Sequence, residues 1–67
     1  MLDLKIDALR SLYKAEIAIY TAEVKNYIQN PVAVGDHGNL VETMDKLIAK
    51  IAEAEDKLLV LETHLSE

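Results

Sequence analysis

Sixty-seven residues without a cysteine make one small domain, residues 1–67, and exclude a disulfide or a thiolate metal site. Chains of this size rarely gain more than about 3–5 kcal/mol from a single core. The net charge of −5, with no clustered basic surface, argues against nucleic acid and anionic lipid as partners. No apolar run approaches the ~20 residues of a membrane span, and Asp3, Lys5 and Asp7 interrupt any signal-peptide core. We therefore expect a soluble, intracellular protein.

Residues 1–29 have helical spacing, and we expect a helix over about 3–29 with Asp3 as its N-cap. The apolar stripe steps by three or four residues and repeats every eleven, which predicts a stripe nearly straight along the helix. Its members are Leu2, Ile6, Leu9, Tyr13, Ile17, Tyr20, Val24 and Ile28.

A second apolar line runs beside this stripe, and a two-helix hairpin does not need it. It consists of Leu4, Ala8, Leu12, Ala15, Ile19 and Ala22. Alanine alone raises helix propensity, but Leu12 and Ile19 are too large for that explanation and indicate a second packing face. The three tyrosines, Tyr13, Tyr20 and Tyr27, are seven apart. They are predicted to lie at the edge of the core, because no basic residues surround them as a ligand platform would require.

The chain turns back in the stretch NPVAVGDHG at residues 30–38, which holds the only proline and both glycines. A single continuous helix is disfavoured because Pro31 lacks a backbone donor and restricts Asn30. We expect the polar residues of this segment to close the hairpin and cap the second helix. The alternative is a metal or anion site at its densest polar group, Asp36 and His37 with Asn30. The predicted turn residues are Asn30, Pro31, Gly35, Asp36, His37 and Asn39.

The second half, residues 39–67, follows a strict seven-residue repeat and predicts a helix over about 37–65. Its eight apolar seam residues are Leu40, Met44, Leu47, Ile51, Ala54, Leu58, Leu61 and Leu65. A flanking line of Val41, Ile48, Ala52 and Leu59 widens the apolar face. This half carries three lysines against seven acids, whereas residues 1–29 sum to zero.

The two halves together predict an all-α fold, an antiparallel two-helix hairpin. Each helix has one stripe for its mate and one left over, and a monomer rarely exposes a patch of that size. We therefore expect a homo-oligomer, with a two-fold dimer forming a four-helix bundle favoured over a trimer of hairpins. The predicted interface residues are Leu12, Ile19, Val41, Ile48 and Leu59.

The sequence offers no catalytic arrangement, and we expect neither an enzyme nor a bound cofactor or metal. There is no Glu-x-x-His motif of a di-metal bundle, because His64 follows Glu62 by only two residues. Ser11 and Ser66 have no positioned histidine to act as a base. The glycines at positions 35 and 38 lack the spacing and the lysine of a phosphate-binding loop.

From Asn30 onward the chain resembles small proteins of marine T4-like phages. The pattern is Asn-Pro-Val-x-Val-Gly, an acid with a histidine, then an acidic and apolar helix: NPVAVGDHGNLVETMDKLIAKIAEAEDKLLVLE. It covers about half of the chain. The resemblance implies a phage or marine-microbial origin and a helical hairpin, in the host cytoplasm or the virion, and brings no activity. Gly38 stands where these proteins often have proline, which leaves the start of the second helix less rigidly set.

These observations favour a non-enzymatic structural or protein–protein interaction module that associates with itself. One alternative is a small acidic regulator that occupies a basic site on a host protein, through residues such as Glu53, Glu55 and Asp56. Another is a helical bundle that binds a metal or ligand through His37. Salt should release an acidic regulator from its partner, whereas an apolar bundle should persist.

Overall fold

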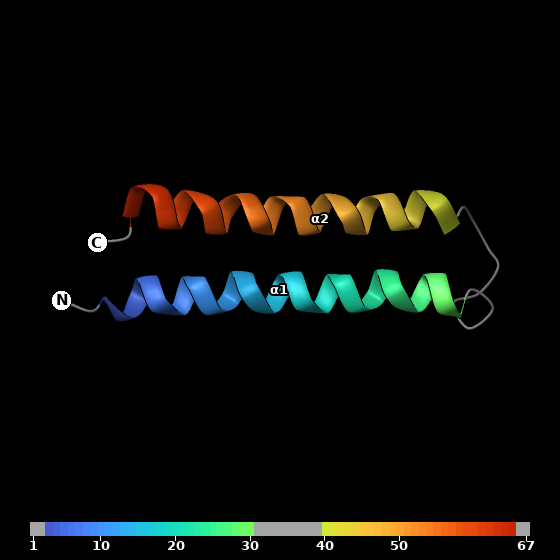
Figure 1. Cartoon of the computed structure of the whole chain (residues 1–67), viewed down its shortest axis with the longest axis horizontal. Helices are drawn as coiled ribbons and strands as arrows, with labels where there is room; N and C mark the ends of the chain where they lie inside the picture. Colours follow the sequence, from blue (N-terminus) through green and yellow to red (C-terminus); the bar gives the residue numbers. More distant parts are fainter. Residues whose placement is uncertain (1–2, 31–39, 66–67) are drawn as a thin grey trace.

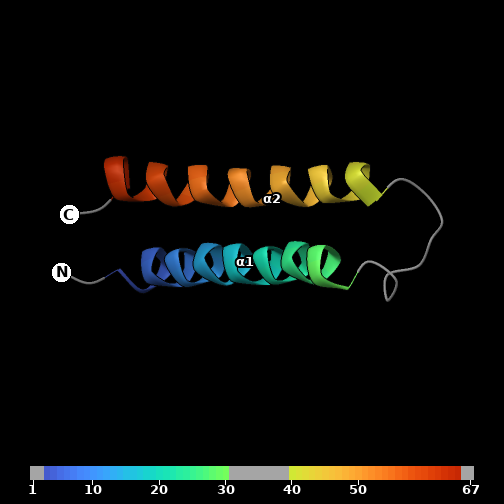
Figure 2. The ribbon, with the colours of Figure 1, turned by 45° about the vertical axis from the view of Figure 1, so that its right-hand side comes forward.

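The computed structural model describes residues 3–30 and 40–65, which form an antiparallel helical hairpin. Helix α1 spans Leu4–Gln29 and α2 spans Leu40–Val60, continued by a π-helical turn, η2, at Leu61–Leu65. The two helices lie side by side along their length in both views (Figures 1 and 2). The predicted all-α hairpin is confirmed, and the described residues contain no strand.

Both ends of α1 are set by local hydrogen bonds. Asp3 is the N-cap, as predicted: its Oδ1 accepts from the backbone N–H groups of Lys5 (2.8 Å) and Ile6 (3.4 Å). At the other end the Asn30 backbone N–H donates to the Asn26 carbonyl at 2.7 Å. The helix thus stops just before Pro31, which cannot donate a backbone hydrogen bond. The remaining predicted turn residues, Pro31, Gly35, Asp36, His37 and Asn39, lie outside the described residues.

The core is the seam of α2, and its predicted seven-residue repeat is confirmed from Leu40 to Leu61. Leu47, Ala54 and Leu61 are buried, and the seam residues between them are half-buried. The prediction of Leu65 as a seam residue is wrong, since 54% of its surface is exposed. It belongs to η2, and a π turn holds more residues than an α turn. The wider turn rotates Leu65 away from the direction that the repeat would give it.

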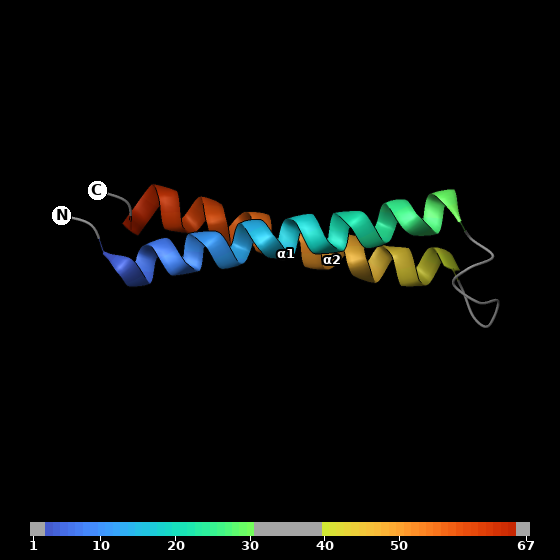
Figure 3. The same cartoon turned by 90° about the horizontal axis from the view of Figure 1, so that it is seen from below.

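The face that α1 turns toward α2 differs from the predicted eleven-residue stripe. Ile28 is 63% exposed and Leu9 is 36% exposed, whereas Arg10 and Tyr27 are half-buried at the seam. The α1 seam therefore steps by four and three residues, as α2 does. Two helices that stay in contact along their length must keep the same repeat, and a repeat of seven makes them wind around each other. They cross in the view of Figure 3. The seam consists of Ile6, Arg10, Tyr13, Ile17, Tyr20, Val24 and Tyr27.

The register between the helices is constant. The Lys50 Nζ lies 5.3 Å from the centroid of the Tyr20 ring, and the Lys57 Nζ lies 5.8 Å from that of Tyr13. Near the open end Arg10 Nε donates to Glu62 Oε1 at 2.6 Å. In each of these three pairs the two residue numbers add up to 70 or 72, as expected of antiparallel helices that keep one register. Ala54 is therefore level with Ile17, so a small side chain on α2 faces a large one on α1 at the middle of the hairpin.

The hairpin is a rod of 50 × 15 × 14 Å. Its radius of gyration is 15.1 Å, whereas a compact domain of the same length has about 11 Å. A rod of two helices has no interior beyond the seam. Every other apolar side chain of the described residues stays at least partly in contact with water.

Candidate interaction surfaces

Two apolar lines remain uncovered on the hairpin. We call them the α1 line, formed by Ala8, Leu12, Ala15, Ile19 and Ala22, and the α2 line, formed by Val41, Ile48, Ala52 and Leu59. All nine residues are exposed. The larger ones are the five predicted interface residues, with exposed fractions of 50% (Leu12), 55% (Ile19), 75% (Val41), 50% (Ile48) and 63% (Leu59). None of them contributes to the seam between α1 and α2.

The two lines point in different directions. At 3.6 residues per turn, the α1 line lies roughly 160° around the helix axis from the α1 seam, so it faces directly away from α2. The α2 line lies roughly 105° from the α2 seam. It follows the flank that carries Glu62, which bonds Arg10. The leftover apolar surface is therefore not the single continuous patch that we expected. It is two narrow surfaces on different sides of one rod.

Charges around the two lines differ in amount. The α1 line itself contains no acid; exposed Lys5 lies at its start, and exposed Lys25 and Glu23 flank its far end. Acids interrupt the α2 line, because residues seven apart lie on the same side of a helix. Asp45 lies seven residues before Ala52, and Glu55 lies seven residues after Ile48. Glu62 follows Glu55 by another seven. Asp45 and Glu55 are exposed. The α2 line is therefore acidic, whereas the charges beside the α1 line balance.

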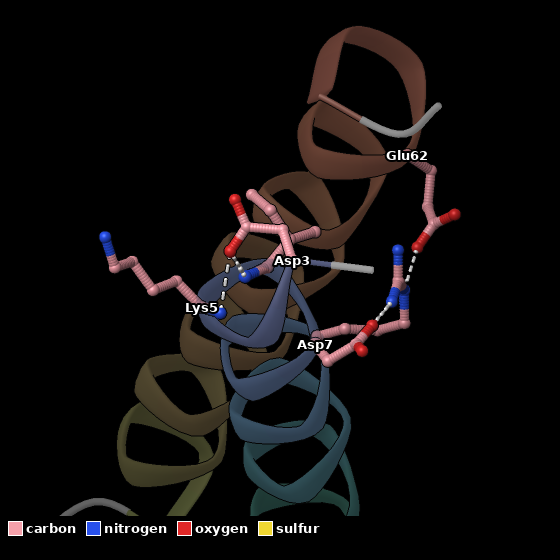
Figure 4. Close-up of polar contacts among 6 residues, drawn as sticks. Asp3, Lys5, Asp7 and Glu62 are labelled. Atoms are coloured by element: carbon pink, nitrogen blue, oxygen red, sulfur yellow. Dashed lines mark hydrogen bonds and ion pairs between the residues drawn. The ribbon is translucent and has the colours of Figure 1, made fainter. Parts of the chain in front are cut away.

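A three-residue ionic network joins the helices at the open end. Arg10 donates from Nε to Glu62 of η2 at 2.6 Å and from Nη1 to Asp7, one turn earlier, at 2.7 Å (Figure 4). The hydrogen bond that Arg10 donates to Glu62 is the main reason why the pKa of Arg10 is raised above its ordinary value. Sequence reasoning missed this role because it counted Arg10 only as a charge. The signal was present, since Arg10 lies four residues after Ile6 and three before Tyr13.

Lysines of α2 cover the tyrosine rings that the sequence singled out. Lys50 lies over Tyr20 and Lys57 over Tyr13, at distances within the range of cation–π contacts. Lys57 also pairs with Glu53 at 3.3 Å, and this hydrogen bond is the main reason why its pKa is raised. Tyr13, Tyr20 and Tyr27 are all half-buried at the seam. They have the core-edge position that we predicted for them, with two of the three rings under a lysine.

The described residues contain no cluster of metal-binding side chains. No group of three or more His, Cys, Asp or Glu side chains within residues 3–30 and 40–65 could hold a metal ion. In the same residues no buried side-chain nitrogen or oxygen lacks a hydrogen-bond partner. No helix in the described part of the chain is long and apolar enough to cross a membrane. The alternative site at Asp36 and His37 falls outside these ranges.

Comparison with known proteins finds no family model, no curated protein and no solved structure that matches this chain. The phage resemblance and the location that it implies stay predictions.

Proposed function

We propose that this protein is a non-enzymatic helical hairpin that associates with copies of itself and serves as a structural or protein–protein interaction element. The observation that carries the proposal is the amount of exposed surface. The chain exposes 5217 Å². A compact monomer of 7.5 kDa exposes only about 4,200 Å². The excess of roughly 1,000 Å² is comparable to the ~800 Å² that each partner contributes to a standard protein interface.

The small core supports the same proposal. Leu47, Ala54 and Leu61 are the only buried side chains of the described residues. Such a core gives little free energy of unfolding, since full burial of one aliphatic side chain contributes about 1.5–3 kcal/mol and ordering each residue costs about 1–2 kcal/mol. Contact between copies would cover the two apolar lines and add a second source of burial.

An acidic regulator has less support. Of the three acids named for this role, Glu53 pairs with Lys57 inside the same helix. The charge of Glu53 is therefore partly neutralised within the chain. An acidic surface built to occupy a basic site on another protein would leave this carboxylate available.

The melting temperature should rise with protein concentration, because association stabilises the folded state by mass action. Circular dichroism of the full chain over a wide concentration range measures this. Repeating the series in high salt separates association through apolar contacts from association through charges. A bundle held by apolar contacts keeps its concentration dependence, since salt screens charges and does not weaken apolar burial. A melting temperature that does not change with concentration would contradict self-association.

A further inference from the structure

We infer that the copies associate head to tail: the α1 line of one copy packs on the α2 line of the next. This inference depends on the proposed self-association and names the two surfaces that make the contact. The occupant of each surface is a second copy of this chain.

The directions of the two lines argue against a two-fold contact. A two-fold interface brings the same surface of both copies together. If two α1 lines met, Ile48 and Leu59 would stay half or more exposed, and if two α2 lines met, so would Leu12 and Ile19. The lines do not form one face, so a two-fold contact on either helix covers only one of them. A contact between unlike lines covers both with a single kind of interface.

Charge supplies the second argument. A contact between two α2 lines would bring Asp45 and Glu55 of one copy near the same acids of the other. Like charges brought together at an interface are destabilising, whereas opposite charges fix the choice of partner. The α1 line itself contains no acid, and exposed Lys5 lies at its start. It is therefore a better partner for the acidic α2 line than a second α2 line is.

The available area fits this arrangement. In a head-to-tail assembly each copy takes part in two contacts, one through each line. If the two lines shared the whole excess exposed area of roughly 1,000 Å² per chain, each contact would bury about 1,000 Å², the lower limit for a specific interface. Contacts of this kind close into a ring of three or more copies or continue as an open fibre. A trimer of hairpins is the smallest such ring.

A mixing experiment tests the inference. The first variant, Leu12→Glu with Ile19→Glu, disables the α1 line, and the second, Ile48→Glu with Leu59→Glu, disables the α2 line. Each should sediment alone at the 7.5 kDa mass of one chain. Mixed in equal amounts, they should form a species of twice that mass, because one variant supplies an intact α1 line and the other an intact α2 line. The two disabled lines carry like charge and do not pair.

Other outcomes separate the two proposals. If either variant alone keeps the mass of the wild type, or if the mixture stays at 7.5 kDa, the head-to-tail contact is wrong although self-association stands. A wild type of 7.5 kDa at every concentration would overturn the proposed function itself. If a variant alone does not fold, circular dichroism replaces the mass, because mixing should then restore helix. Thr43→Glu, at an exposed position outside both lines, is the matched control and should keep the wild-type mass.

Discussion

Replacing Leu61 by alanine is expected to unfold most of the protein at room temperature. Leu61 is 2% exposed and lies where η2 meets α1. Truncating a buried leucine to alanine costs about 2–5 kcal/mol, because the burial of the removed atoms is lost and a cavity remains. A single core of this size supplies only about 3–5 kcal/mol. The loss is therefore comparable to the whole free energy of unfolding.

Urea unfolding followed by circular dichroism measures this effect at a fixed protein concentration. Val60→Ala is the matched control, since Val60 is the preceding residue, is 45% exposed and belongs to neither apolar line. It should change the free energy of unfolding by less than about 1 kcal/mol, as most surface substitutions do. Equal losses for the two variants would show that the seam does not hold the hairpin together.

The second large effect is expected at Tyr27, and it tests the repeat of α1 directly. Tyr27→Ala removes a half-buried ring from the seam and should cost about 2 kcal/mol, less than the ~3–5 kcal/mol of a fully buried aromatic side chain. Ile28→Ala removes a side chain that is 63% exposed, and the loss should stay below about 0.5 kcal/mol. The two variants differ by one position along the same helix.

Urea unfolding of the two variants, measured side by side, decides between the repeats. With an eleven-residue stripe, Ile28 would face α2 and its truncation would be the costly one. A larger loss at Ile28 than at Tyr27 would therefore contradict the seven-residue seam of α1. A single tyrosine at the end of the helix thus reports on how the two helices wind around each other.

The fold followed from local patterns in the sequence. Asp3 was recognisable as an N-cap because its carboxylate precedes a periodic run, and Pro31 marked the end of the first helix. The seam of α2 was recognisable because its positions from Leu40 to Leu61 are all apolar. In each case the pattern lies within one element, and the partner helix changes nothing about it.

The seam of α1 could not be predicted in the same way. Reading apolar residues alone led to Leu9 and Ile28, because Arg10 is charged and Ile28 is more apolar than Tyr27. The partner helix decides between them: α2 has a repeat of seven, and α1 must match it to stay in contact. Arg10 is accepted in the seam because Asp7 and Glu62 bind its guanidinium at the open end, near solvent.

The exposed apolar residues outside the seam were predicted one by one, but their relative placement was not. That Leu12, Ile19, Val41, Ile48 and Leu59 would be left over followed from the width of each apolar face. The directions of the two lines depend on how each helix is rotated against the other. The contacts of Lys50 with Tyr20 and of Arg10 with Glu62 fix that rotation, and neither was apparent in the sequence.

Sedimentation equilibrium of the wild-type chain tests the central claim most directly. Self-association predicts a mass that exceeds the 7.5 kDa of one chain and rises with concentration toward a multiple of it. The measurement needs no variant and no knowledge of the contact. A single species of 7.5 kDa at every concentration would contradict the account.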